Sequence, residues 1–189
     1  MEKAFEERRR TQEDEYFHRQ ELSLVERMHQ RATLETERQG IRLAVGIAYD
    51  DCAEALRVLG YKAETVPLVY LVPLVQVAWA DGGLTAPERE HIETAAHGRG
   101  IELGSGAHRQ LLEWLHTPPP DEFFRGTLQV VRRLLDALPA AERATKQREL
   151  LDSCYGIAAA SRGLLGLARK VSKAELAVLK TIEAEFAVA

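Results

Sequence analysis

The feature that most constrains the fold of this chain is an abrupt change in composition near Gly40. The residues before it are almost entirely charged and polar, and they include no proline and no other glycine. After it, apolar residues recur at the spacing of an α-helix as far as Phe186. The change predicts two parts, a long charged helix over residues 1–42 and a helical bundle over residues 43–189.

Composition favours helices over strands in both parts. The 189 residues are 46% hydrophobic but only 6% aromatic. Half-buried strands use β-branched and aromatic residues, whereas the abundant Leu, Ala and Glu favour helices. We therefore expect an all-α fold, with one long N-terminal helix followed by a bundle of about six or seven helices.

Charge and hydropathy exclude several classes of protein. A net charge of -4 does not suit a nucleic-acid-binding protein, which normally carries a basic surface. The longest apolar stretch, residues 66–80, is interrupted by two prolines and Gln76, and a membrane span needs roughly 18 apolar residues. The charged N-terminus does not resemble a signal peptide. We expect a cytoplasmic protein that does not span a membrane, with Cys52 and Cys154 as buried small hydrophobes.

Glycines, prolines and capping signals divide the second part into helices. Pro73 either kinks the second of these helices or marks its first turn. Thr85 with Glu88, and Ser172 with Glu175, form two capping boxes that open later helices. The expected helices cover residues 41–59, 66–80, 85–98, 107–116, 121–138, 139–160 and 172–186.

A short internal echo relates the two capping boxes. Each follows a helix that ends in small residues and a glycine, as Ala-Trp-Ala-Asp-Gly in the first case and Ala-Ala-Ala-Ser-Arg-Gly in the second. The echo predicts two related helical hairpins that pack face to face.

The charged N-terminal segment contains the run Ala4-Phe5-x-x-Arg8, followed by Glu13-x-x-Tyr16-Phe17-x-x-Gln20. This run, over residues 3–20, resembles the inhibitory core of the F-type ATP synthase inhibitor family. The resemblance implies that the helix enters an open interface between the catalytic α and β subunits, folds as the interface closes, and blocks rotation. The candidate partner-binding residues are Phe5, Arg8, Glu13, Tyr16, Phe17 and Gln20.

The chemistry of these residue types agrees with that implication. Exposed aromatic side chains commonly anchor interfaces, which suits Phe5 and Tyr16. Arg9 and Glu15 depart from the family pattern, and the histidine-rich coiled coil of some members is missing. Two other interpretations stay open, a solvated helical arm and a helix that oligomerises. The apolar positions of this segment do not keep a heptad over several repeats, which counts against a long coiled coil.

The bundle carries a second group of motifs, Val77-Ala78-Trp79-Ala80-Asp81-Gly82, then Thr85-x-x-Glu88, then a Pro-Pro-x-x-x-Phe stretch. From residue 66 onward the chain resembles a TerB-like domain, the tellurite-resistance helical fold. The resemblance implies an acidic loop that holds a divalent cation such as Ca²⁺, with Asp81 and Glu88 as candidate ligands.

Simpler roles account for both carboxylates, since Asp81 suits a turn and Glu88 a capping box. The second repeat has Ser161-Arg162-Gly163 where the family pattern would place Asp-Gly, and two carboxylates alone rarely make a tight site. No cofactor other than this cation is indicated.

No phosphate loop, nucleophile elbow or pair of catalytic acids occurs, so we do not expect an enzyme. The leading expectation is an inhibitor of ATP hydrolysis by F-type ATP synthase, located in the cytoplasm and associated with the membrane-bound synthase. The alternative is a TerB-like stress-response protein that binds a divalent cation or a partner protein, with the N-terminal helix as an interaction arm. The oligomeric state is left open by the sequence.

Overall fold

The computed structural model describes the backbone of residues 2–45, 50–160 and 171–187, and side chains for residues 19–44, 51–160 and 171–187. Within these ranges the chain forms α-helices and one 3-10 helix (η1) and no strand, so the all-α prediction is confirmed. The elements are α1 (Glu2–Val45), α2 (Asp50–Val58), η1 (Val66–Leu71), α3 (Val72–Ala78), α4 (Ala86–Gly98), α5 (Gly106–His116), α6 (Asp121–Asp136), α7 (Ala140–Ala160) and α8 (Lys173–Ala187).

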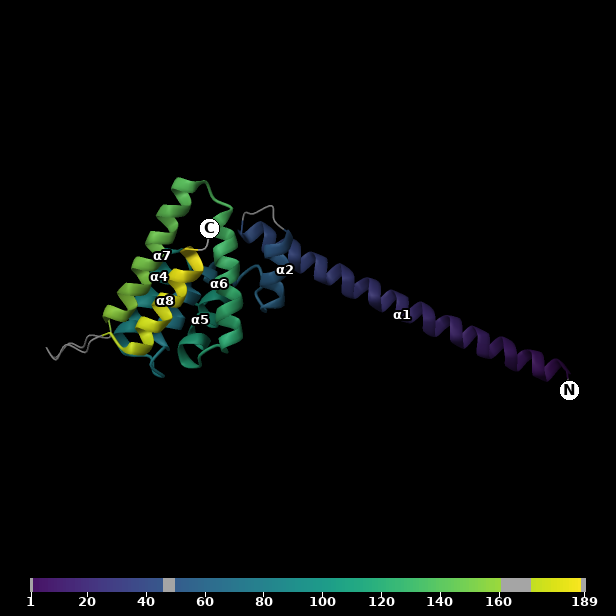
Figure 1. The fold of residues 1–189 in the computed structure, drawn as a ribbon. Helices are drawn as coiled ribbons and strands as arrows, with labels where there is room; N and C mark the ends of the chain where they lie inside the picture. The colour runs from purple at the N-terminus through teal and green to yellow at the C-terminus, as the bar shows by residue number, and fades with distance from the viewer. Residues whose placement is uncertain (1, 46–49, 161–170, 188–189) are drawn as a thin grey trace.

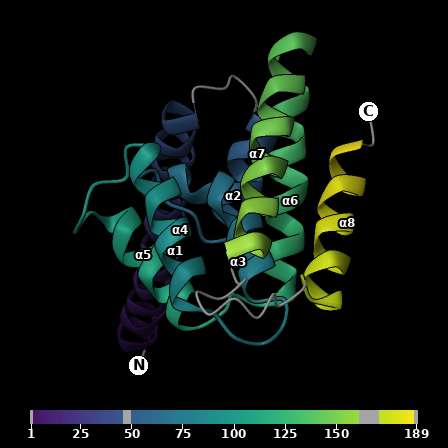
Figure 2. The same ribbon diagram turned by 90° about the vertical axis from the view of Figure 1, so that its left-hand side faces the viewer.

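The molecule consists of one projecting helix and one bundle. Figure 1 shows α1 extending away from the other helices, with the N-terminus at its far end. At 1.5 Å per residue its 44 residues span about 66 Å. The remaining helices pack together, with α6, α7 and α8 running side by side and α3 at the centre (Figure 2). A long N-terminal helix followed by a helical bundle was the predicted arrangement.

The predicted helix over residues 41–59 is wrong. α1 continues through Gly40 to Val45, and α2 begins separately at Asp50, with residues 46–49 outside the described part of the chain. A glycine inside a helix costs only about 1 kcal/mol relative to alanine, so it does not have to end the helix. At Gly40 the missing side chain also has a use, because a Cβ there would lie 3.3 Å from the Cβ of Ala63.

The apolar segment over residues 66–80 forms the centre of the bundle, as its composition predicts. It is divided into η1 and α3, and Pro73 lies in the first turn of α3, so this proline starts a helix. Every residue of α3 except Gln76 is buried. α3 contacts α4, α6, α7 and α8.

Two helices end on glycines whose backbone is left-handed. Gly60 follows α2 with φ +86°, and Gly100 follows α4 with φ +78°. After α4 the amide of Ile101 donates to the carbonyl of Ala96 at 3.2 Å, and the amide of Gly100 donates to the carbonyl of His97 at 2.9 Å. This is the Schellman pattern, which needs a positive φ that glycine adopts without strain.

Side-chain hydrogen bonds link α5 to the helices before it. The indole nitrogen of Trp79 donates to the carbonyl of Trp114 at 2.9 Å, and the guanidinium of Arg89 donates to the carbonyl of Leu115 at 2.7 Å. Both acceptors lie in the last turn of α5, where helix carbonyls lack partners within the helix.

Cys52 and Cys154 are buried and form no disulfide, which matches the expectation from the sequence. None of the described helices is both long enough and apolar enough to cross a membrane.

Candidate functional site

The candidate partner-binding residues all lie on α1. Phe5, Arg8, Glu13, Tyr16 and Phe17 occupy its outer part, and their side chains fall outside the described residues. Gln20 is the only one of the six whose side chain is described, and it is exposed. The backbone over this segment is one unbroken helix, so the motif keeps the helical spacing that the sequence predicts.

The middle of α1 is not buried by any residue that the structure describes. Every residue from 19 to 37 is exposed. The side-chain hydrogen bonds seen here connect residues one turn apart, such as Arg27 to the carbonyl of Ser23 at 3.2 Å. Large apolar side chains are nevertheless present, and their exposed fractions are 55% for Leu22, 53% for Leu24, 44% for Val25 and 60% for Met28.

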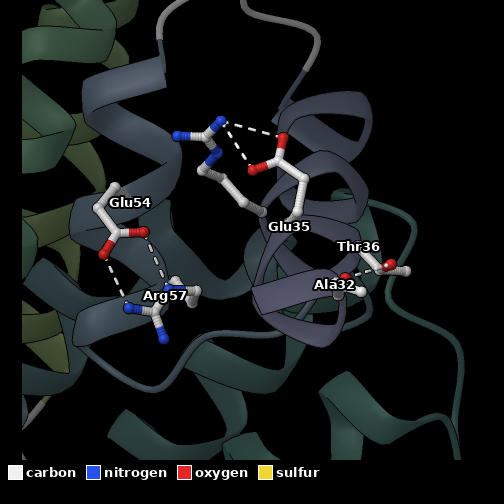
Figure 3. Close-up of polar contacts among 6 residues, drawn as sticks. Ala32, Glu35, Thr36, Glu54 and Arg57 are labelled. Carbon is white, nitrogen blue, oxygen red and sulfur yellow. Dashed lines mark hydrogen bonds and ion pairs between the residues drawn. The ribbon is translucent and has the colours of Figure 1, made fainter. Parts of the chain in front are cut away.

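The base of α1 is packed against the bundle. Ile41 is fully buried and belongs to the main core, and the end of α1 contacts α2 and η1. Figure 3 shows the polar contacts at this junction, where Glu35 on α1 pairs with Arg38 at 2.9 Å and Glu54 on α2 pairs with Arg57 at 2.7 Å.

Charges on the two helices of the junction are complementary. The pKa of Glu54 is lowered, first by its hydrogen bond from Arg57 and further by the positive charge of Arg38 on α1. In the same way Glu54 raises the pKa of Arg57, and the carboxylate of Glu37 on α1 adds to this. The buried Ile41 therefore attaches the arm, and Arg38 and Glu37 of α1 carry charges opposite to those of Glu54 and Arg57 of α2.

The acidic loop of the bundle takes the form of a capped helix start. Asp81 is exposed in the turn before α4, whereas Glu88 is 2% exposed. Thr85 donates to a carboxylate oxygen of Glu88 through its amide and its hydroxyl, each at 2.7 Å. The amide of Glu88 donates back to the Thr85 hydroxyl, which completes the predicted capping box.

The second predicted capping box is also formed. The amide of Ser172 donates to a carboxylate oxygen of Glu175 at 2.5 Å, and the amide of Glu175 donates to the hydroxyl of Ser172 at 3.0 Å. Glu175 is 2% exposed, like Glu88. The counterpart of Asp81-Gly82 in the second repeat, Ser161-Arg162-Gly163, lies outside the described residues.

The fold brings these two buried glutamates toward each other. Burial raises the pKa of Glu88, the hydrogen bonds from Thr85 oppose this, and the charges of Glu175 and then Asp81 raise it further. The sequence assigned only a capping role to Glu175. The internal echo was the signal that could have paired it with Glu88, because related hairpins place equivalent residues at equivalent positions.

This acidic region does not form a complete metal site. In the part of the chain that the structure describes, no three His, Cys, Asp or Glu side chains lie close enough together to hold a metal ion. A carboxylate oxygen of Glu88 accepts hydrogen bonds from Thr85, and one of Glu175 accepts a hydrogen bond from Ser172, so both carboxylates already take part in helix caps. The arrangement can cap helices and concentrate negative charge at one end of α4 and α8.

One surface feature had no signal in the sequence. A groove of about 720 Å³ lies between η1, α4, α6 and α7. Its lining combines apolar residues such as Tyr70 and Leu135 with an ion pair between Lys146 and Glu149. These residues come from elements far apart in the sequence, so no local pattern could have identified the groove.

Comparison with known proteins adds no relative, because no protein-family model, curated protein or solved structure matches this chain.

Proposed function

We propose that this protein inhibits ATP hydrolysis by an F-type ATP synthase through the outer part of α1, which inserts between the catalytic α and β subunits. The observation that carries this proposal is the position of the motif. Residues 5–20 occupy the end of a continuous helix that extends away from the bundle (Figure 1).

The physical character of the arm supports insertion into a partner. A charged helix without tertiary contacts is only marginally stable alone, so it can complete its folding against another protein. Residues 5–20 span about 24 Å as a helix, a length that fits a cleft between two subunits. Phe5, Tyr16 and Phe17 supply the aromatic residue type that anchors such interfaces.

The exposed stretch over residues 21–37 then acts as a spacer. It corresponds to about 26 Å of helix between the motif and the bundle. The bundle stays outside the interface and anchors the arm through the buried Ile41. In this proposal it takes the place of the coiled coil of the inhibitor family, as an anchor, a dimerisation module or a sensor.

The test is an assay of ATP hydrolysis by purified F-type ATPase during turnover, titrated with the native protein and with the double variant Phe5→Ala/Tyr16→Ala. We expect the native protein to inhibit. Two anchors of about 2 kcal/mol each would weaken binding roughly 1000-fold when removed. Leu43→Ala is the matched control, because Leu43 is an exposed apolar residue of the same helix outside the motif.

Absence of inhibition at micromolar protein, with turnover running at both pH 6 and pH 8, would disprove the proposal. Equal loss of inhibition in the double variant and in Leu43→Ala would also count against it, because the effect would then not depend on the motif.

The alternative function is that of a TerB-like stress-response protein that binds a divalent cation. The specific observation in its favour is the approach of the buried Glu88 and Glu175 near Asp81. Calorimetry with Ca²⁺ tests it, and binding that Asp81→Ala removes would support it. No heat of binding at millimolar Ca²⁺ would exclude it.

A further inference from the structure

We propose that α1 pairs in an antiparallel way with α1 of a second copy of this chain, through residues 21–31. The pairing surface consists of Glu21, Leu24, Val25, Met28 and Arg31. This inference does not rest on the proposed function, because the pairing surface lies outside the motif at residues 5–20 and its test requires no ATPase.

The five residues share one face of the helix. Successive residues of an α-helix are about 100° apart around its axis. Glu21, Leu24, Met28 and Arg31 therefore fall within an arc of about 80°, and Val25 extends this arc to about 120°. An apolar stripe about 100° wide is typical of a helix that packs against a partner.

None of the residues that the structure describes covers this face. Leu24, Val25 and Met28 are 53%, 44% and 60% exposed, and every residue of the surrounding stretch from 19 to 37 is exposed as well. Within the described part of the chain, neither Glu21 nor Arg31 has an ion-pair or side-chain hydrogen-bond partner. Removing the apolar side chains from water would be favourable.

The order of charges along the face selects a second copy as the occupant. In an antiparallel pair the two helices run in opposite directions, so the residue numbers of opposite positions have a constant sum. If Leu24 of one chain lies opposite Met28 of the other, Glu21 therefore lies opposite Arg31. The two-fold symmetry gives this acid–base contact twice. A parallel pair would place Glu21 opposite Glu21 and Arg31 opposite Arg31, and such like-charge contacts are unfavourable.

The bundle does not obstruct the pairing surface. Gly40 and Ile41 pack against the bundle at the base of α1. On the helix they lie about 120° from Met28 in one direction and about 140° in the other. Leu24, Val25 and Met28 therefore face away from the bundle.

Arg31 lies at the edge of the pairing surface, where it also lines a shallow groove with Glu54 and Arg57 of α2, and its side chain is exposed. Two arms can approach through this surface while both bundles stay on the outside.

The apolar part of the surface is only about two turns long. This agrees with the lack of a sustained heptad pattern in the sequence. We therefore expect a short crossing of two helices and a weak dimer, with a dissociation constant of about 10 to 100 µM.

The test is sedimentation equilibrium of the full chain over about 1 µM to about 1 mM, a range that brackets this dissociation constant. Glu21→Arg and Arg31→Glu each convert both acid–base contacts into like-charge contacts, so each single variant should weaken the dimer by about tenfold or more. The double variant Glu21→Arg/Arg31→Glu restores opposite charges and should recover the native association.

Leu24→Ala and Leu22→Ala form the matched control pair. The two leucines are almost equally exposed, at 53% and 55%, but they lie about 160° apart around the helix, on nearly opposite faces. Leu24→Ala should weaken the dimer and Leu22→Ala should not, while circular dichroism confirms that helix content is unchanged in each variant.

A monomer throughout the concentration range would overturn the proposal. So would a double charge variant that associates as weakly as the single variants, or equal weakening by Leu22→Ala and Leu24→Ala.

Discussion

α1 and α3 are both helices, but they are stabilised in different ways. α1 has 44 residues, and its side chains from residue 19 to residue 37 are all exposed. α3 has seven residues and buries all of them except Gln76. A seven-residue helix is not stable alone, so α3 depends on tertiary packing, whereas α1 depends on local interactions.

The comparison explains why the two regions suit different roles. The bundle surrounds α3 with four other helices, and losing any of these contacts would expose apolar core. The arm can bind another molecule without disturbing that core, since Ile41 at its base is the one residue among the described side chains of α1 that belongs to the core. A surface that binds another molecule is therefore more easily carried by the arm than by the helices that enclose α3.

The largest expected effect tests the dependence of the bundle on its central helix. Leu74 in α3 is fully buried. Leu74→Ala should lower the free energy of unfolding by about 2–5 kcal/mol, through lost burial and the cavity left behind. Urea denaturation followed by tryptophan fluorescence measures this for the bundle alone, because the only two tryptophans, Trp79 and Trp114, lie within it.

Leu24→Ala on the arm is the counterpart and should change the same transition by less than about 0.5 kcal/mol. A larger effect of Leu24→Ala would mean that the arm supports the bundle, and the division between the two regions would fail.

A smaller effect is expected at the point where the regions join. Ile41 is fully buried, and Leu43, two residues later on the same helix, is 77% exposed. Ile41→Ala should destabilise the bundle by about 2 kcal/mol, at the low end for such a change because Ile41 is the one buried residue among the described side chains of α1. The same urea denaturation measures it.

Leu43→Ala should have no measurable effect on that transition. Equal effects of the two substitutions would show that the end of α1 does not dock as described.

The smallest effect concerns the pH dependence of the bundle through Glu88. Because the pKa of Glu88 is raised in the folded protein, chiefly by burial, the folded state binds this proton more tightly than the unfolded chain. Its contribution favours folding below the ordinary pKa of a glutamate and is lost as the pH rises through the folded pKa. Glu88→Gln should therefore reduce the loss of stability between about pH 4 and pH 7.

Urea denaturation at several pH values checks this, with Glu90→Gln, an exposed glutamate of the same helix, as the control. If Glu88→Gln and the native protein show the same pH dependence, the buried carboxyl does not titrate differently in the two states.

Much of the fold was predictable because local signals in this chain are strong. The capping boxes at Thr85 and Ser172 mark the starts of α4 and α8 correctly. The prediction that a new helix begins after Gly40 is wrong, because α1 continues to Val45. A glycine inside a helix also permits close packing, and only the position of Ala63 reveals that use.

The candidate sites were predictable to a lesser degree. Asp81 and Glu88 were found from a local motif, but the approach of Glu175 comes from helix packing across more than eighty residues. The groove beside Tyr70 also arises from the packing of segments that are far apart in the sequence. Whether the motif at residues 5–20 binds a partner is still a prediction.

The sequence by itself determined the all-helical character, the charged arm and most helix ends, because composition, capping residues and periodicity act over a few residues. Only the tertiary structure decided that α1 continues into the core at Ile41, that the face carrying Leu24 and Met28 is left uncovered, and that Glu88 and Glu175 approach each other. These features depend on contacts between distant segments, and the free energy of such contacts is set by packing that no short stretch of sequence specifies.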